Sequence, residues 1–314
     1  MTKSLITLGT LILLAVTFGC GGGGGGSSSG SSTGTVSMSI TDAKPVLPGL
    51  VTNCFVTIDE VLVHSSGGGW ESLKMVQTPY TIDLLQFTDG ATTEFVPPAE
   101  LPSGKYTQVR LSVVSAKLRF NEDPNDEVEI TIPSENLKTD QNFDFDIAEG
   151  DAVDITIDFD LSKSIVVTGP AANPSYKLKP VLHIVETAGS ATIEGTIANK
   201  SFGEVEPGVI PYVVITVFDS TGQEYTSIKV EKTTSDVKGN PVNETSYEIF
   251  WLVPNQAYTV RINYNPGKDD DPATDGIQDN YDESVLVPPA SDPDYPDGTL
   301  PPGDIYTLNF PHTT

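Results

Sequence analysis

Two groups of side chains in this sequence could do chemistry, and both lie outside its regular apolar patterns. Cys20 follows an apolar stretch and runs directly into glycine and serine in TFGCGGGGGGSSSGSSTG. Glycine and serine cannot build a core around a thiol, so Cys20 is a candidate for covalent modification rather than for packing. The second group is a run of carboxylates in KDDDPATDGIQDNYDE, whose oxygens are the ligands that hard cations prefer.

The residues before Cys20 have the features of an export signal. Lys3 supplies a short positive start, and residues 5–18 form an apolar core shorter than the ~20 residues that a spanning helix needs. Gly19 and Cys20 resemble the end of a bacterial lipobox, in which the thiol receives a diacylglycerol and the preceding peptide is removed. We therefore expect a lipoprotein signal peptide at residues 1–19 and lipidation of Cys20. An ordinary cleaved signal and an uncleaved anchor helix are the alternatives.

Residues 20–34 then form the lipidated cysteine and a Gly/Ser tether. By random-coil scaling, about 14 such residues reach roughly 20 Å, which holds a domain just clear of a membrane surface. Gly21 stands where enterobacteria place an aspartate to retain lipoproteins in the inner membrane. We therefore expect the outer membrane as a partner through the lipid, with the periplasmic and the outward face both open.

The acidic run resembles the calcium loops of thrombospondin type 3 repeats, in which carboxylates turn inward on the ion and a glycine allows the bend. Gly276 fits that glycine, whereas Ala273 stands where the pattern has a further aspartate. A weak calcium site is therefore one interpretation, and a merely solvated acidic loop is the other. No further cofactor is expected. The candidate ligands are Asp269, Asp271, Asp275, Asp279 and Asp282.

The remaining residues offer no recognisable catalytic pattern. His64, His183 and His312 lie far apart without metal-ligand spacing, and there is no H-E-x-x-H helix or Gly-rich phosphate loop. The formal charge of −26, from 43 acidic and 17 basic residues, disfavours nucleic acid as a partner. Cys54 is the only other cysteine, and its strand-like surroundings predict a buried, inert thiol.

Alternating apolar residues predict an all-β protein. Val36, Met38 and Ile40 share one face of the first predicted strand. The next run, CFVTIDEVLVH, keeps this alternation only with a shift of register in its middle. Turns rich in glycine and proline separate the strands, and Trp70 and Trp251 are expected in the cores rather than as sugar-stacking platforms.

The segment FDFDIAEGDAVDITIDFDLSKSIVVTG predicts two strands around the AEGD turn, with phenylalanine, isoleucine and valine on one face. The opposite face would then collect five aspartates, and like charges across a strand pair are destabilising. Solvation or salt bridges with Lys117, Arg119, Lys177 and Lys179 would compensate, and a bound cation is the alternative. The five acids are Asp144, Asp146, Asp154, Asp158 and Asp160.

Several motifs in the first part of the chain resemble the bacterial lipoprotein family known as domain of unknown function 4382 (DUF4382). They are GTVSMSITDA, VTIDEVLVHSSGGGWESL, DLLQF followed by LPSGKYTQVRLSV, and IDFDLSKSIVVTG followed by YKLKPVLHIV. The resemblance covers residues 35–187 and implies a secreted or lipid-anchored β-sandwich-like module. That family has no established activity, so the resemblance implies no catalytic residue.

The break ETAGSA separates this part from residues 191–312, which are similar to transthyretin-like modules of the carboxypeptidase regulatory-like or Cna-B type. The motifs are ATIEGTIAN, PYVVITVFDSTGQEYTSIKVEKT and SYEIFWLVPNQAYTV. This resemblance implies a second β-sandwich, of the kind found in stalks and adhesion scaffolds. The expected fold is therefore all-β, with two tandem immunoglobulin- or transthyretin-like sandwiches after the tether.

Together these features predict a lipid-anchored cell-envelope protein that acts in binding, in adhesion or as a scaffold, without catalysis. Its partner would be an envelope polysaccharide or another protein. Two alternatives stay open. A carbohydrate-active or other envelope enzyme would need an open cleft with a pair of carboxylates or a Ser/His pair. A subunit of a surface filament or secretion assembly would need an unpaired edge strand.

Overall fold

Strands dominate the chain, as the alternating sequence predicts. The computed structural model describes residues 32–47, 51–121, 123, 126–133, 136–138, 143–170, 172–203, 205, 209–264 and 283–310. None of the helices in these ranges is long and apolar enough to span a membrane. The prediction of an all-β fold is confirmed. The helical elements described are α1 (Leu161–Ser164) and the single 3-10 turns η1 (Leu84–Gln86), η2 (Thr187–Gly189) and η3 (Asn199–Ser201).

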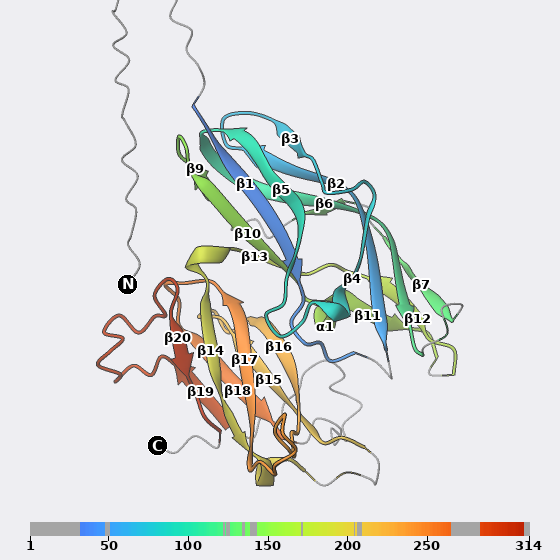
Figure 1. The fold of residues 1–314 in the computed structure, drawn as a ribbon, viewed down its shortest axis with the longest axis vertical. Coiled ribbons are helices and arrows are strands. Elements are labelled where there is room, and N and C mark those ends of the chain that lie inside the picture. Colours follow the sequence, from blue (N-terminus) through green and yellow to red (C-terminus); the bar gives the residue numbers. More distant parts are fainter. Residues whose placement is uncertain are drawn as a thin grey trace, which may run out of the picture. The chain divides into compact units, whose positions relative to one another are not determined.

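The first two sheets are built from strands β1 to β13. One has the order β13-β10-β1-β5, and the other has the order β11-β12-β7-β6-β2-β3, with β4 added to β2 and with β8 and β9 added to β6. β1 and β10 pair in parallel, with Thr35 opposite the distant Ala152, and Figure 1 shows blue β1 beside green β10. The bounds are β1 (Thr33–Thr41), β2 (Asn53–Ser65), β3 (Trp70–Leu73), β4 (Tyr80–Asp83), β5 (Thr93–Pro102), β6 (Gly104–Arg119), β7 (Glu127–Thr131), β8 (Asn136–Lys138), β9 (Phe145–Ile147), β10 (Ala152–Phe159), β11 (Ile165–Thr168), β12 (Ser175–Leu178) and β13 (Leu182–Glu186).

The apolar faces of these two sheets pack into one core. Met38 and Ile40 of β1 are fully buried, as the alternation predicts. Along β2 the buried positions change phase because the pairing with β6 shifts register between Thr57 and Glu60, as a β-bulge does. Cys54 lies in the same core with no exposed surface, and burial raises the pKa of its thiol far above the ordinary value. The predicted burial of this thiol is confirmed.

The remaining strands form two further sheets around a second core, with the orders β17-β14-β20 and β16-β15-β18-β19. β20 closes the first of these sheets by pairing in parallel with β14. Gly195 of β14 permits this approach, since a Cβ atom there would lie 1.7 Å from the carbonyl oxygen of Leu308. The bounds are β14 (Ala191–Ala198), β15 (Tyr212–Phe218), β16 (Glu224–Glu231), β17 (Glu244–Leu252), β18 (Tyr258–Asn263), β19 (Glu283–Val287) and β20 (Ile305–Thr307).

We call residues 33–186 the N-terminal half and residues 191–310 the C-terminal half. Each half has its own hydrophobic core, and both belong to one compact unit that spans residues 32–314. The boundary is not a simple linker, because Ala43, which follows β1, packs against the core of the C-terminal half. A segment of the N-terminal half therefore contributes to the packing around the core of the C-terminal half.

The strand pair predicted around the AEGD turn is wrong. β9 pairs with β6, whereas β10 pairs with β1 and β13, so the chain crosses from one sheet to the other at residues 148–151. The predicted apolar faces are confirmed, with Phe145 and Ile157 buried. Two apolar rows that face each other across a core have the same sequence pattern as two rows side by side in a hairpin.

Candidate functional site

A buried group of polar side chains lies where the two halves meet. It is built on two segments of the N-terminal half: residues 42–46, which follow β1, and the short helix α1, which follows β10. β1 and β10 are parallel neighbours, so both segments leave the sheet at the same end. The backbone nitrogen of Val46 donates a hydrogen bond to Oγ of Ser162 (2.9 Å), which ties the two segments together.

Three buried aspartates hold these two segments in place by accepting hydrogen bonds from their main chain. Asp42 accepts a hydrogen bond from the backbone nitrogen of Leu161 (3.0 Å), and Asp158 accepts one from the backbone nitrogen of Ala43 (3.0 Å). Asp160 caps the first turn of α1. All three are almost fully enclosed, with exposed fractions of 2% for Asp42, 4% for Asp158 and 1% for Asp160. The carboxylates therefore satisfy main-chain donors where the ladder of β1 and β10 has ended.

Lys163 connects the N-terminal half to the C-terminal half. Its ammonium donates to the carbonyl oxygens of Glu224 (3.0 Å) and Tyr225 (2.7 Å) at the start of β16. The same nitrogen lies 3.2 Å from Oδ2 of Asp160. One cation thus links a buried carboxylate of one half to two main-chain acceptors of the other.

His183 and Tyr225 stack across the same boundary. Their ring centroids are 4.3 Å apart, and Nε2 of His183 lies 3.6 Å from Oδ2 of Asp160. The hydroxyl of Tyr225 donates to the carbonyl oxygen of Trp251 (3.1 Å), and burial raises the pKa of this phenol well above its ordinary value. Tyr225 is therefore held as a neutral hydrogen-bond donor at the boundary.

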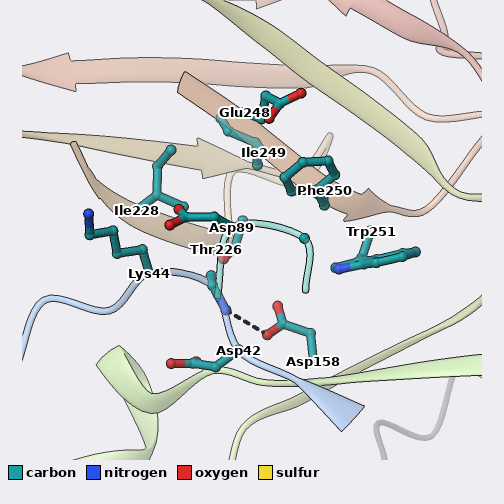
Figure 2. Close-up of a pocket in the computed structure, with 12 residues that line it drawn as sticks. Asp42, Lys44, Asp89, Asp158, Thr226, Ile228, Glu248, Ile249, Phe250 and Trp251 are labelled. Carbon is teal, nitrogen blue, oxygen red and sulfur yellow. Dashed lines mark hydrogen bonds between the residues drawn. The ribbon is translucent and has the colours of Figure 1, made fainter. Parts of the chain in front are cut away.

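A small cavity lies beside this cluster (Figure 2). Its volume is about 20 Å³, which is room for one water-sized group and too little for an organic substrate. Phe250 and Trp251 come from the end of β17, where the pairing with β14 shifts register. Trp251 has a φ of 62°, a costly conformation for a bulky residue. Figure 2 shows these two rings on one side of the cavity and Asp42 and Asp158 on another.

Gly90 supplies a further contact between the halves. It has a φ of 80°, and a Cβ atom at this position would lie 2.8 Å from ring atoms of Phe250. A glycine is therefore needed here for two reasons, the backbone conformation and the close approach of the ring.

Burial and mutual repulsion decide the charge states of the aspartates. Burial raises the pKa of Asp42 well above its ordinary value, and neighbouring Asp158 adds to this effect. Burial likewise raises the pKa of Asp158 to about 6, against the opposing influence of His183. Burial alone would also raise the pKa of Asp160, but His183 and the ammonium of Lys163 outweigh it and hold that pKa below its ordinary value. The cluster thus contains one firmly ionised carboxylate and two that burial favours in the protonated form.

The structure separates the five aspartates that were predicted to share one solvated face. Asp144, Asp146 and Asp154 are exposed, as predicted. The prediction is wrong for Asp158 and Asp160, which are buried in the cluster between the halves. The reason is that the end of β10 reaches past the first core to the boundary with the second, where both of its faces are covered.

Two of the four basic residues expected to compensate these aspartates have other partners. Lys117 and Arg119 of β6 both contact the carboxylate of Glu127 on β7, at 3.1 and 2.7 Å. Asp144 instead forms an ion pair with Lys105. Sequence alternation placed these side chains on outward faces, but only the order of the strands decides which charges become neighbours.

Neither tryptophan lies in a core, contrary to the prediction. Both are half-buried: Trp251 lines the cavity, and Trp70 lies under the guanidinium of Arg110, 4.0 Å from the ring centroid. The edge of His64 packs on Trp70 at a centroid distance of 5.0 Å. Since Arg110 covers a face of the Trp70 ring, this tryptophan is not a free platform for a sugar.

A second hollow is an open groove of about 500 Å³ on the N-terminal half, lined in part by Asp59 and Glu60. β4 pairs with β2 up to Ile58 and β3 pairs with it from Val61, so the two acids lie in the gap between these strands. Oδ1 of Asp59 is enclosed and has no hydrogen-bond partner among the described residues, whereas Glu60 is exposed. The register shift of β2 was visible in the sequence, but the gap beside it was not.

Several predicted residues lie outside the described part of the chain. They are Cys20, His312 and the candidate calcium ligands Asp269, Asp271, Asp275, Asp279 and Asp282. Within the described ranges, no group of three His, Cys, Asp or Glu side chains is placed to hold a metal ion.

Comparison with solved structures finds only remote similarity. The Bacillus anthracis TIE protein is 14% identical with a TM-score of 0.19, and the match covers 90% of this chain and 35% of that protein, so the chain spans about a third of its length. A candidate cell adhesion protein from Bacteroides fragilis is 10% identical with a TM-score of 0.20, covering 88% and 91% of the two chains. The fimbrial anchor protein Mfa2 from Porphyromonas gingivalis is 9% identical with a TM-score of 0.16, covering 74% and 79%.

No curated protein matches the chain. The comparison with protein families agrees with the resemblance seen in the sequence, since residues 33–180 match the family described as domain of unknown function DUF4382. The matched segment includes Asp42, Asp158, Asp160 and Lys163, which form most of the cluster between the halves. The match to DUF4382 thus covers residues 33–180, just under half of the chain.

Proposed function

We propose that this protein is a lipid-anchored scaffold of the bacterial cell envelope that acts in adhesion or surface structure and has no catalytic activity. In this proposal Cys20 carries the lipid, the tether runs from residue 21 to the start of β1 at Thr33, and the two halves form the displayed part. The outer membrane is the proposed location. The C-terminal half would serve as a carboxypeptidase regulatory-like spacer.

One observation supports this proposal above the others: the buried polar side chains at the boundary bond to main-chain atoms of the described residues, and Lys163 does so from one half to the other. Asp42 and Asp158 accept main-chain hydrogen bonds, and Lys163 donates to two main-chain carbonyls. The adjoining cavity of about 20 Å³ has no room for an organic substrate. A catalytic site needs polar groups that face a substrate, whereas these groups face the backbone of their own chain.

The anchor is tested by fractionation of the parent protein and the Cys20→Ser variant. The parent should sediment with membranes, and the variant should appear in the soluble fraction with an unchanged far-ultraviolet circular dichroism spectrum, because the tether separates the lipid from both cores. Cys54→Ser is the matched control, because it replaces the other thiol and should leave the location unchanged. An unmodified Cys20 in the mass spectrum of the mature protein would refute the anchor.

A carbohydrate-active role is the second candidate function, and the open groove at Asp59 and Glu60 is the observation that favours it. An enzyme of that class needs two acids that act on one bond. If the groove were catalytic, Glu60→Gln would abolish hydrolysis of an envelope polysaccharide, while Glu94→Gln on β5 would not. The scaffold proposal expects no hydrolysis by the parent protein. Binding of a polysaccharide without its hydrolysis would fit an adhesion role.

A further inference from the structure

The charges buried between the halves do not balance. Asp42, Asp158 and Asp160 are all nearly enclosed, and the ammonium of Lys163 lies 3.2 Å from Oδ2 of Asp160. Asp160 uses that ammonium, whereas Oδ2 of Asp42 has no hydrogen-bond partner among the described residues. A buried carboxylate without a compensating partner is costly when ionised, and protonation removes most of that cost.

The unbalanced carboxylates, Asp42 and Asp158, lie at the boundary between the two halves. Asp158 bonds to Ala43, which packs on the core of the C-terminal half, and the cavity beside Asp42 and Asp158 is walled by β16 and β17 of that half. Asp42 and Asp158 line this cavity together with Thr226 and Trp251, as Figure 2 shows. Separation of the halves would bring water to both carboxylates.

We propose that docking of the two halves is coupled to uptake of a proton by Asp42 and Asp158, so that mildly acidic conditions tighten the boundary and a neutral pH loosens it. This inference goes beyond the scaffold function and does not depend on the lipid anchor. It gives the envelope protein an internal contact that responds to the acidity of its surroundings.

Other titratable groups surround the pair on the elements packed against it. His183 of β13 is the register partner of Asp158, and it contacts Asp160 as well. Tyr225 stacks on His183 from β16. The remaining charged or titratable neighbours are Lys44 and Asp89 from the N-terminal half, Glu224 and Glu248 from the C-terminal half, and Cys54 and Asp83 behind Asp42 in the first core.

The direction of the pH effect follows from the aspartate pKa values. Burial raises the pKa of Asp42, and it raises that of Asp158 to about 6, so the closed boundary holds more protons than the open one between about pH 4 and pH 6. Closure is therefore favoured at the acidic end of this window and loses that support as the pH rises through 6. Asp160 affects closure in the opposite direction because its pKa is lowered. Its ionised form favours the closed boundary, and this contribution is lost only in stronger acid.

The test uses a tryptophan that the boundary already contains. The chain has two tryptophans, so Trp70→Phe leaves Trp251, which lines the cavity, as the single reporter. Acrylamide quenching of Trp251 in the chain from Gly21 onward measures the open fraction between pH 4.5 and pH 8. We expect the opening equilibrium to rise by about tenfold between pH 5 and pH 7.5.

Two variants separate this coupling from a general effect of pH. Asp158→Asn preserves an oxygen acceptor for Ala43 without a titratable group, and it should make the change in opening over this window clearly smaller than in the parent, because only Asp42 then still takes up a proton on closure. Asp154→Asn, on the same strand but exposed, should leave the tenfold change intact. A flat response of the parent, or an equal response in Asp158→Asn, would overturn the proposal. If Asp158→Asn does not fold, carbon-13 titration of the parent's aspartate carboxyls decides, and ordinary pKa values for both Asp42 and Asp158 would refute the coupling.

Discussion

β1 and β20 complete the sheets of their two halves in the same way and differ in how deeply they are embedded. Along the chain, β1 is the first strand of its half and β20 is the last strand of its half. Both pair in parallel with a strand that is distant in the sequence. β1 is nine residues long and lies between β10 and β5, whereas β20 has three residues at the edge of its sheet. β1 is therefore a central strand of its sheet in the N-terminal half, whereas β20 is a short edge strand of its sheet in the C-terminal half.

The largest expected effect comes from one substitution made in both strands. Ile40→Ala on β1 removes a fully buried side chain and should lower the free energy of unfolding by about 2–5 kcal/mol. Ile305→Ala on β20 removes a side chain that is 59% exposed and should change it by less than about 0.5 kcal/mol. Urea unfolding of the two variants gives both values. Equal losses would show that β20 is as central to its half as β1.

A smaller effect is expected where the two halves touch. Gly90→Ala and Gly150→Ala both place a methyl group at a φ of about 80°, so they share the same backbone cost, roughly 1–2 kcal/mol. Only at Gly90 does the methyl group meet a side chain of the other half, the ring of Phe250, while at Gly150 nothing lies within 4 Å. Gly90→Ala should therefore be the less stable variant by a further 1 kcal/mol or so. Equal melting temperatures would mean that the ring moves aside freely.

The smallest expected effect is confined to the C-terminal half. If Asp275 and Asp279 bind calcium with a Kd near 10⁻⁴ M, about 1 mM calcium should stabilise the chain by roughly 1.4 kcal/mol, a rise of a few degrees in Tm. Asp275→Asn combined with Asp279→Asn should abolish this gain, and Asp292→Asn with Asp294→Asn is the matched acidic control. Calorimetry with calcium and then with chelator measures it. Identical curves for the parent protein would leave a solvated acidic loop.

Sequence patterns predicted which residues form strands better than they predicted which strands pair with each other. Alternation located β1 and the register shift in β2, because burial of one face repeats every second residue. It could not show that β9 and β10 belong to different sheets, since both arrangements bury Phe145 and Ile157 equally well. Strand order is decided by long-range packing, which leaves no local pattern.

The cluster between the halves was predicted only in its residue types. Alternation predicts a solvated face for Asp158 and Asp160, because a second half that covers the end of β10 cannot be inferred from it. Ala43 and His183 gave no signal of their own. In the structure residues 155–161 are all buried, a run too long for a strand with one solvated face, and this burial could not be read from the sequence.

The central claim is that the buried polar side chains serve to join the halves, and Lys163→Met tests it most directly. This variant keeps the aliphatic stem but removes the ammonium that bonds to Glu224 and Tyr225, and it leaves Asp160 without its cation, a loss of about 3–5 kcal/mol for a buried pair. Lys179→Met, at an exposed position, is the control. We expect one calorimetric transition for the parent and for Lys179→Met, and two separate transitions for Lys163→Met. A single transition in Lys163→Met, at the temperature of the control, would contradict the claim.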